Sequence, residues 1–230
     1  MTEPGVKRTS GRGRFITFEG GEGSGKSTQV KTLAERLGAA KLRTIVTREP
    51  GGSPGAEIIR HLVLSGMGKL LGPEAETLLF AAARDDHVRN VIEPALNQGI
   101  WVLCDRFSDS TRVYQGSLGK VAPAVLNAME RVTIGDLKPD LTIILDVPVE
   151  VGMKRAAARR GGGAPDRFEA EDVRFHQELR DAYRQIAAGE PQRCVLIDAN
   201  TDAAAVAAGV WAALRDRFFT AGAGNVASSA

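Results

Sequence analysis

The sequence contains few cysteines and no long apolar run. Only two of its 230 residues are cysteines, Cys104 and Cys194, and both lie in apolar segments. We interpret them as small core residues and predict neither a disulfide nor a metal-binding pair. No segment approaches the roughly 18 consecutive apolar residues that a membrane-spanning helix needs, so the sequence predicts no such helix.

The net charge is small as well. At +2, it gives no general case for binding nucleic acid or a membrane surface, and we expect neither as a partner. The N-terminal segment is basic but lacks the apolar core of a signal peptide, so we expect a cytoplasmic protein. No repeat or linker divides the chain, and its length and 43% apolar content indicate one large α/β domain.

What the sequence does contain is a phosphate-binding loop. Residues 20–27 fit the pattern G-x-x-x-x-G-K-[ST]. The eight residues are Gly20, Gly21, Glu22, Gly23, Ser24, Gly25, Lys26 and Ser27. Glycines let backbone N–H groups turn toward phosphate oxygens, Lys26 can reach the β- and γ-phosphates, and the Ser27 hydroxyl can ligate Mg²⁺. A strand expected at 14–18 and a helix expected at 26–37 flank the loop, which favours this interpretation over a plain glycine-rich turn.

Strand-like and helix-like segments alternate along the rest of the chain. Apolar strands are expected at 14–18, 44–47, 101–105, 141–146 and 194–198, and helices at 26–37, 54–64, 73–96, 122–133, 149–160, 171–188 and 203–219. Continuous apolar strands between helices predict a five-stranded parallel sheet with helices on both faces. The fold class is therefore α/β, a three-layer P-loop NTPase fold with a lid loop.

We divide the chain into one domain and two tails. Residues 1–13 are predicted to be a disordered N-terminal arm and residues 220–230 a flexible C-terminal tail. Residues 14–219 form the P-loop domain, with a lid at about 155–168. The lid prediction rests on four arginines around a run of glycines, at Arg155, Arg159, Arg160 and Arg167, because phosphoryl transfer needs cations that cover the transferred group. The alternative is a solvated basic loop.

Two strands end in a carboxylate that could hold Mg²⁺. Asp105 and Asp146 both follow apolar runs, as a Walker B carboxylate does. We favour Asp105, because Arg106 follows it and supplies a fork that can grip phosphate. For Asp146, a capping or loop role ahead of Pro148 is an equally good interpretation.

Three further segments carry polar or aromatic residues beyond strand ends. Arg48-Glu49-Pro50-Gly51-Gly52 is rich in turn residues, and the Glu49–Pro50 bond could be cis or trans. Phe80 and Arg84 lie four residues apart and share a helix face, although Phe80 could be core and Arg84 could extend to solvent. Residues 109–116 carry a Tyr and a Gln, or are an ordinary capped helix start.

Taken together, these motifs resemble a bacterial thymidylate kinase over almost all of residues 14–219. The resemblance rests on Phe18-Glu19-Gly20 with Gly25-Lys26-Ser27, Arg48-Glu49-Pro50-Gly51-Gly52, Phe80 with Arg84, Asp105-Arg106-Phe107, Ser110-Thr111 with Tyr114-Gln115-Gly116, Pro139-Asp140-Leu141 and the arginine-rich lid. Two departures are Phe107, where Tyr or His is common, and the extended loop at 160–165, which shifts the lid alignment by a few residues.

The resemblance implies a reaction and a role for each residue. The family transfers the γ-phosphate of ATP to dTMP with Mg²⁺, giving dTDP, and is usually a homodimer. The implied nucleoside pocket consists of Phe80 stacking on thymine, Arg84 on its edge, and Ser110, Thr111, Tyr114 and Gln115. Arg48 and Arg106 would bind the acceptor phosphate, and Glu22 would meet the sugar 3′-hydroxyl. This P-loop has no Arg, a form that the family combines with lid arginines, here Arg155 and Arg159.

The mechanism expected from these residues is alignment and charge neutralisation. The acceptor phosphate is already a nucleophile, so no strong base is needed. The expected catalytic groups are Lys26, Arg48, Arg106, Arg155 and Arg159, with Ser27 and Asp105 as Mg²⁺ ligands.

Three other functions share part of this pattern. A GTP-dependent switch would need an Asn-Lys-x-Asp motif, and the sequence has no Asn-Lys pair. Another deoxynucleoside or nucleoside monophosphate kinase would have the same fold, but Phe80, Arg84 and residues 110–116 favour thymidine. A nucleotide-binding protein without catalysis is disfavoured by the intact Lys26, Ser27 and Asp105.

Overall fold

A computed structural model describes residues 11–161, 163 and 167–219. The predicted tails at 1–10 and 220–230, and part of the predicted lid at 162 and 164–166, lie outside the described residues. Residues 11–13 of the predicted arm are described, and Gly13 is buried and donates its backbone N–H to the Leu96 carbonyl. This end of the predicted arm is therefore packed against the domain. None of the helices described is long and apolar enough to cross a membrane.

The core of the fold is a five-stranded sheet in which every paired strand runs parallel to its neighbour. The strands are β1 (Phe15–Glu19), β2 (Thr44–Arg48), β3 (Trp101–Asp105), β4 (Leu141–Asp146) and β5 (Cys194–Asp198). Their order across the sheet is β2-β3-β1-β4-β5. Each expected strand is found within one residue of its predicted bounds, because buried strands of a parallel sheet are nearly continuous apolar runs.

Helices connect consecutive strands. The α-helices are α1 (Lys26–Ala39), α2 (Pro54–Leu64), α3 (Pro73–His87), α4 (Glu93–Asn97), α5 (Ser108–Thr111), α6 (Pro123–Thr133), α7 (Val149–Arg160), α8 (Val173–Gly189) and α9 (Ala203–Phe218), and a 3-10 helix covers Met67–Leu71. Three begin with proline, whose fixed φ and missing N–H suit the first helical position. Asp172 and Asp202 cap α8 and α9 by accepting backbone N–H groups.

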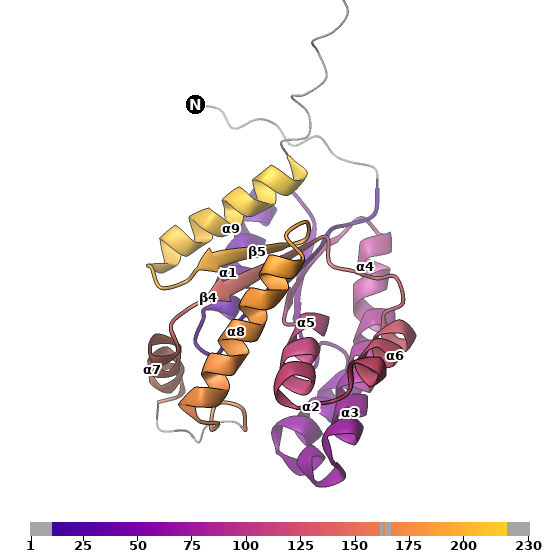
Figure 1. The fold of residues 1–230 in the computed structure, drawn as a ribbon. Helices are drawn as coiled ribbons and strands as arrows, with labels where there is room; N and C mark the ends of the chain where they lie inside the picture. The colour runs from indigo at the N-terminus through magenta and orange to yellow at the C-terminus, as the bar shows by residue number, and fades with distance from the viewer. Residues whose placement is uncertain (1–10, 162, 164–166, 220–230) are drawn as a thin grey trace, which may run out of the picture.

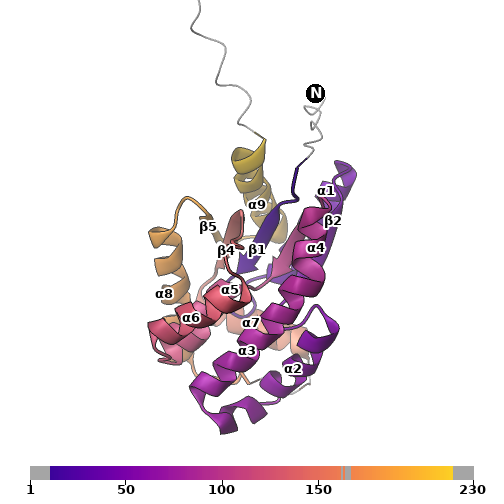
Figure 2. The ribbon, with the colours of Figure 1, turned by 90° about the vertical axis from the view of Figure 1, so that its right-hand side faces the viewer.

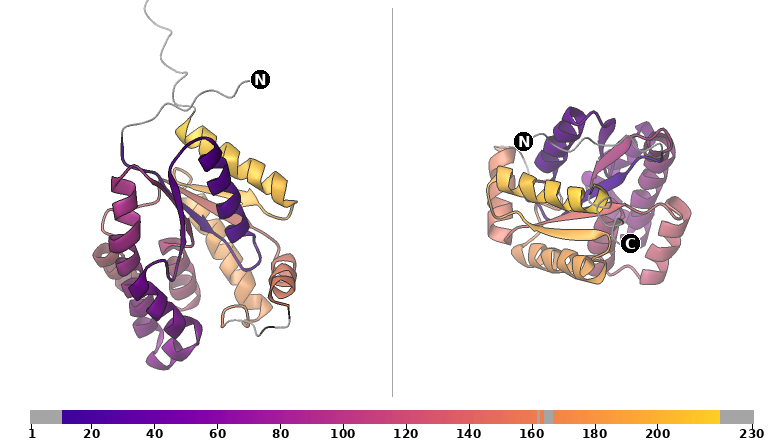
Figure 3. Two further views of the ribbon diagram at one scale, coloured as in Figure 1. Left: turned by 180° about the vertical axis from the view of Figure 1, so that it is seen from behind. Right: turned by 90° about the horizontal axis from the view of Figure 1, so that it is seen from above.

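Helices cover both faces of the sheet, as predicted. Alternate residues of β1 point to opposite faces. Ile16 and Phe18 pack under α1 and α9, which lie in front of the sheet when the molecule is seen from behind (Figure 3, left). Phe15 packs on the opposite face against α4, and α8 also covers this face, in front in Figure 1. The view from above shows the resulting three layers (Figure 3, right).

The long helix predicted at 73–96 is not one regular α-helix. α3 ends at His87, residues Val88–Ile92 form a π-helical segment, and α4 continues almost in line (Figure 2). A second π-helical segment, Arg112–Leu118, follows α5. π-helical segments are rare and concentrate at functional sites. Here each follows a residue that lines the cavity described below, Arg84 in the first case and Thr111 in the second.

The carboxyl ends of the parallel strands meet at one edge of the sheet. Glu19, Arg48, Asp105 and Asp146 each end a strand. Ligands of open α/β sheets bind at this edge, so the fold gathers the candidate residues in the region where a site is expected.

Candidate active site

The loop of residues 20–27 has the conformation of a phosphate cradle. Gly20, Gly23 and Gly25 have φ angles of 134°, 64° and 91°, which favour glycine. A side chain at Gly23 would also lie 2.0 Å from the Gly152 carbonyl oxygen. The Lys26 ammonium donates to the carbonyl oxygens of Gly20 and Gly21 at 3.0 and 2.8 Å. Helix α1 begins at Lys26 and directs its N-terminus at the loop, where it favours an anion.

The two predicted metal ligands are adjacent. The Ser27 hydroxyl donates to Oδ2 of Asp105 at 2.5 Å. A hydroxyl and a carboxylate are oxygen ligands of the kind Mg²⁺ prefers, and Mg²⁺ in nucleotide sites takes its other ligands from phosphates and water. Among the described residues, no group of three or more His, Cys, Asp or Glu is placed to hold a metal. The donor set therefore fits an ion bound together with nucleotide phosphates.

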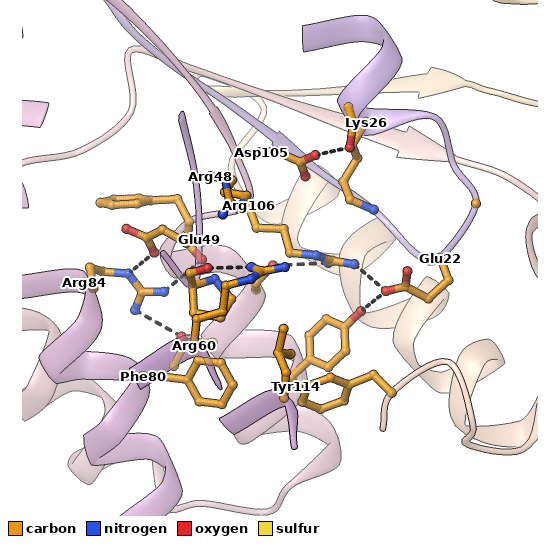
Figure 4. Close-up of a pocket in the computed structure, with 18 of the residues that line it drawn as sticks. Glu22, Lys26, Arg48, Glu49, Arg60, Phe80, Arg84, Asp105, Arg106 and Tyr114 are labelled. Carbon is orange, nitrogen blue, oxygen red and sulfur yellow. Dashed lines mark hydrogen bonds and ion pairs between the residues drawn. The ribbon is translucent and has the colours of Figure 1, made fainter. Parts of the chain in front are cut away.

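Arg106 joins the phosphate loop to the rest of the pocket. Its φ of 70° is unusual for a side chain other than glycine. It donates to Glu22 at 2.5 Å and to the Gly20 carbonyl at 3.2 Å, and its guanidinium lies 5.2 Å from the centre of the Tyr114 ring. Tyr114 also donates to Glu22, at 3.3 Å. Figure 4 shows Arg106 reaching across the pocket toward Glu22.

Burial and neighbouring charges shift two pKa values in this region. Burial raises the pKa of Glu22, but Arg106 and Lys26 outweigh it and lower that pKa to about 2. Burial, with Arg106 as a second cause, lowers the pKa of Lys26 to about 8. Glu22 is therefore a fixed anion at neutral pH, whereas the charge on Lys26 depends on its partners.

One cavity of about 360 Å³ connects the phosphate loop with the predicted nucleoside residues. Its walls are Glu22, Gly23, Gly25, Lys26, Ser27, Thr28, Arg48, Glu49, Pro50, Arg60, Leu64, Phe80, Arg84, Asp105, Arg106, Phe107, Ser110, Thr111, Tyr114, Gln115, Arg159 and Phe168. The cavity wall thus brings together all predicted site residues except four. The exceptions are Gly20, Gly21 and Ser24 of the phosphate loop, and Arg155. Its wall combines the cations Lys26, Arg48, Arg106 and Arg159 with the rings of Phe80 and Tyr114, so it can hold phosphates beside a planar base.

Arg84 is buried and does not extend to solvent. Its side chain is 7% exposed, and it pairs with Glu49 at 2.8 Å. Phe80, one helical turn earlier, is 9% exposed and lines the same cavity. The interpretation of Arg84 as a solvent-directed side chain is therefore wrong. Figure 4 shows Phe80 and Arg84 on the opposite side of the pocket from Glu22 and Lys26.

The turn after β2 forms another wall. Its Glu49–Pro50 peptide bond, left open by the sequence, is cis. The Pro50 carbonyl accepts a hydrogen bond of 2.6 Å from Arg60, and Arg48 pairs with Glu57 at 2.8 Å. Two guanidinium groups therefore enter from this side, of which the sequence analysis named only Arg48.

The two lid arginines expected to take part in catalysis, Arg155 and Arg159, lie in different surroundings. Arg159 lines the cavity and pairs with Glu169 at 2.8 Å. Arg155, one turn earlier on α7, donates to the carbonyl of Ala199 at 2.8 Å and is not part of the cavity wall. Beyond them, Phe168 lines the cavity and contacts the Tyr114 ring edge-to-face, with 5.0 Å between ring centres.

Asp146 neither caps α7 nor joins the cavity wall. It accepts bidentate bonds from Arg180 and Arg184 of α8, at distances of 2.7–3.2 Å. The residue at the start of α7 is instead Pro148. The capping interpretation is therefore wrong, and the carboxylate ties α8 to the end of β4.

Glu19 supports the site, a role that its place in the motif Phe18-Glu19-Gly20 did not predict. Glu19 is fully buried and accepts bonds from the Phe107 N–H at 2.8 Å and the Ser110 hydroxyl at 2.7 Å. Burial, with Asp109 as a second cause, raises its pKa to about 7. Its position at a strand end was a visible signal, but its partners lie 88 residues or more away in sequence. Phe107, a departure from the family, is buried and packs edge-to-face on Phe15.

The similar proteins and the family model reported next are all described as thymidylate kinases. The family model described as thymidylate kinase matches residues 18–209. The thymidylate kinase of Nitrobacter winogradskyi is 78% identical over the full length of both chains. That of Nitrobacter hamburgensis is 80% identical over 96% of each chain. The crystal structure of thymidylate kinase from Ehrlichia chaffeensis superposes with a TM-score of 0.70 at 33% identity, covering 89% of this chain and 99% of that one.

Proposed function

This chain belongs to the thymidylate kinase family and is a phosphotransferase, and we propose that the cavity described above binds dTMP beside the γ-phosphate of ATP. The observation that carries the proposal is the single cavity with a phosphate loop at one end and Phe80 and Arg84 at the other. Such a cavity places donor and acceptor in one enclosure, as direct transfer requires. The product would be dTDP.

The donor would be held by the phosphate loop. Backbone N–H groups of residues 20–27 would bind phosphate oxygens, and the Lys26 ammonium would leave its carbonyl partners to neutralise the β- and γ-phosphates. Ser27 and Asp105 would hold Mg²⁺. The ion, when bound, would offset the negative charge that builds up on the phosphates during transfer.

The acceptor would lie between α3, α5 and the lid segment. Phe80 would stack on the base and Arg84 would donate to its edge, with Ser110, Thr111, Tyr114 and Gln115 completing the wall. Arg48 and Arg106 would bind the acceptor phosphate. The Glu22 carboxylate would accept a bond from the sugar hydroxyl, a role supported by its ionised state and its contacts with Arg106 and Tyr114.

Transfer in this site needs alignment and charge neutralisation, because the acceptor phosphate is already a nucleophile. Lys26 and Arg106 both act on Glu22 to lower its pKa, and as cations they would offset the negative charge of the phosphates. Arg159 would add a third cation from the lid. Arg155 stays a candidate through its place on the same helix, although it contacts Ala199.

We also propose that the protein is a homodimer. Among the described residues, nine large hydrophobic side chains are exposed, and six of them lie on α2, the 3-10 helix Met67–Leu71, α3 and α6: Ile58, Met67, Leu70, Leu71, Leu78 and Val132. These helices share one side of the molecule (Figure 2). An apolar face of this kind suits a self-complementary interface, which analytical ultracentrifugation tests. The cytoplasmic location stays a prediction, to be tested by cell fractionation.

Arg84→Ala tests the proposed acceptor site. We expect KM for dTMP to rise about 30-fold or more and KM for ATP to change less than about threefold, since a charged hydrogen bond contributes roughly 1.5–3 kcal/mol. Steady-state kinetics with each substrate varied in turn gives both constants. Equal effects on the two substrates would contradict the base-recognition role of Arg84.

A further inference from the structure

A chain of polar contacts runs from Thr47 of β2, where it is partly buried, through His87 and Glu49 to Arg84, where it is fully buried. The Thr47 hydroxyl lies 2.6 Å from Nε2 of His87, and Nδ1 of His87 lies 3.0 Å from Oε1 of Glu49. The other Glu49 oxygen accepts from Nε of Arg84 at 2.8 Å. His87 is 0% exposed and the Glu49 side chain 4%. Nothing in the transfer reaction uses His87 or Thr47 directly.

The partners of His87 define its protonated nitrogen. A carboxylate oxygen only accepts hydrogen bonds, so Nδ1 of His87 carries a proton and donates to Glu49. In the neutral ring Nε2 then accepts from the Thr47 hydroxyl. Gly52 closes this side tightly, since a Cβ there would lie 2.4 Å from Oγ1 of Thr47 and 2.5 Å from Nε2 of His87. The imidazole is therefore held in one orientation.

Arg84 receives its orientation from three contacts. Besides Glu49, its Nη1 donates to Oγ1 of Thr111 at 3.0 Å and its Nη2 to the Phe107 carbonyl at 3.2 Å. These contacts use three of the five N–H groups of a guanidinium. Among the described residues, one N–H on each Nη has no hydrogen-bond partner, and Arg84 lines the cavity. N–H donors of Arg84 that face the edge of a base can bond a carbonyl oxygen there. An amino group at the same place is itself a donor and would be disfavoured.

We propose that His87 and Glu49 are positioning residues for base recognition, His87 orienting the Glu49 carboxylate, which fixes Arg84 with two N–H donors toward the base. The inference rests on the proposed function, because it needs Arg84 at the acceptor base. It explains why a buried imidazole is kept between a hydroxyl and a carboxylate, where an apolar side chain would need no partners.

Two substitutions of His87 separate positioning from packing. The amide of His87→Asn lies near the place of Nδ1 and can still donate to Glu49, whereas the amide of His87→Gln lies near the place of Nε2 and reaches Thr47 instead. We expect His87→Gln to raise KM for dTMP about tenfold, the loss of one charged hydrogen bond. We expect His87→Asn to raise it less than about threefold, with KM for ATP and kcat within about twofold in both.

The matched control is Thr47→Val, which removes the hydroxyl on the far side of the ring. It has no contact with Arg84, and we expect KM for dTMP to stay within about twofold of wild type. Because KM does not depend on the concentration of active enzyme, partial unfolding of a variant leaves the comparison valid. The preference for dTMP over dCMP, taken as a ratio of kcat/KM, should fall about tenfold in His87→Gln only.

Equal KM values for dTMP in His87→Gln and His87→Asn, whether raised or unchanged, would overturn the proposal. So would a rise in KM for ATP equal to that for dTMP. Arg84→Ala separates this failure from failure of the proposed function. If Arg84→Ala raises KM for dTMP while the two His87 variants are alike, base recognition by Arg84 stands and positioning by His87 falls.

Discussion

Replacing Glu19 with Gln is expected to change how the stability of the protein depends on pH. Glu19 is 0% exposed at the end of β1 and accepts bonds from Phe107, Ser110 and the Tyr183 hydroxyl, the last at 2.9 Å. Burial first, and the Asp109 carboxylate second, raise its pKa from the ordinary 4.5 to about 7, although Ser110 and Arg106 favour the anion. An ionised Glu19 is therefore costly in the folded state.

The size and sign of the effect follow from this pKa. Because the folded-state pKa is raised, protonated Glu19 contributes stability that is fully present below pH 4.5 and is lost as the pH rises through about 7. At about 1.4 kcal/mol per pH unit, the loss between about pH 5 and about pH 7.5 is roughly 2–3 kcal/mol. The Gln side chain does not titrate, so the free energy of unfolding of Glu19→Gln should rise relative to that of the wild type by this amount over the same pH range.

Urea unfolding of both proteins across that pH range measures the difference. The free energy of unfolding of wild type minus that of Glu19→Gln should fall steadily as the pH rises. Glu22→Gln is the matched control, because the pKa of Glu22 is lowered to about 2 and no slope is expected above pH 5. A difference for Glu19→Gln that does not change with pH would refute the burial argument.

Four further tests concern the phosphate loop, the lid and the proposed dimer interface. Lys26→Ala should remain folded and lose about 10²- to 10³-fold in kcat/KM for ATP. A near-normal turnover would contradict the role of Lys26 in binding the phosphates of ATP. In the wild type, kcat/KM for ATP should fall about tenfold per pH unit above about 8, because Lys26 has its pKa lowered to about 8 and binds phosphate as the cation; a pH-independent value up to about 9.5 contradicts this. Arg159→Ala should lower kcat at least about tenfold more than Arg155→Ala, since only Arg159 lines the cavity; equal losses would point to a shared lid role. Leu70→Glu should yield a monomer by ultracentrifugation, as Leu70 is 86% exposed on the apolar face; an unchanged species excludes that face as the interface.

The sheet was predictable from sequence because its strands are short apolar runs that end at charged residues. The run at 141–146 shows this, since its first five residues are buried and Asp146 is only partly so. The helical stretch at 73–96 was less predictable from the sequence. A π-helical segment inserts one extra residue into a turn, and apolar spacing hardly registers that change.

The site was predictable where a motif fixes local geometry, and not where distant partners decide it. Lys26 is held by hydrogen bonds to Gly20 and Gly21 of the same loop. The alternative of a solvent-directed Arg84 stayed open in the sequence because its partner Glu49 lies 35 residues earlier. The bidentate pairs of Asp146 likewise come from α8, 34 and 38 residues later. Spacing along the chain carries no sign of such pairs, because only packing brings them together.

The most direct test of the account is the choice of acceptor. Purified protein with ATP and Mg²⁺ is given dTMP, dUMP, dCMP, dGMP or dAMP in turn, and both the nucleoside diphosphate and ADP are quantified by chromatography. The account predicts stoichiometric dTDP and ADP, with kcat/KM for dTMP at least about 10²-fold above that for dCMP, the discrimination expected of a site that hydrogen-bonds its substrate. A preferred acceptor other than dTMP, or ADP release without dTDP, would contradict it.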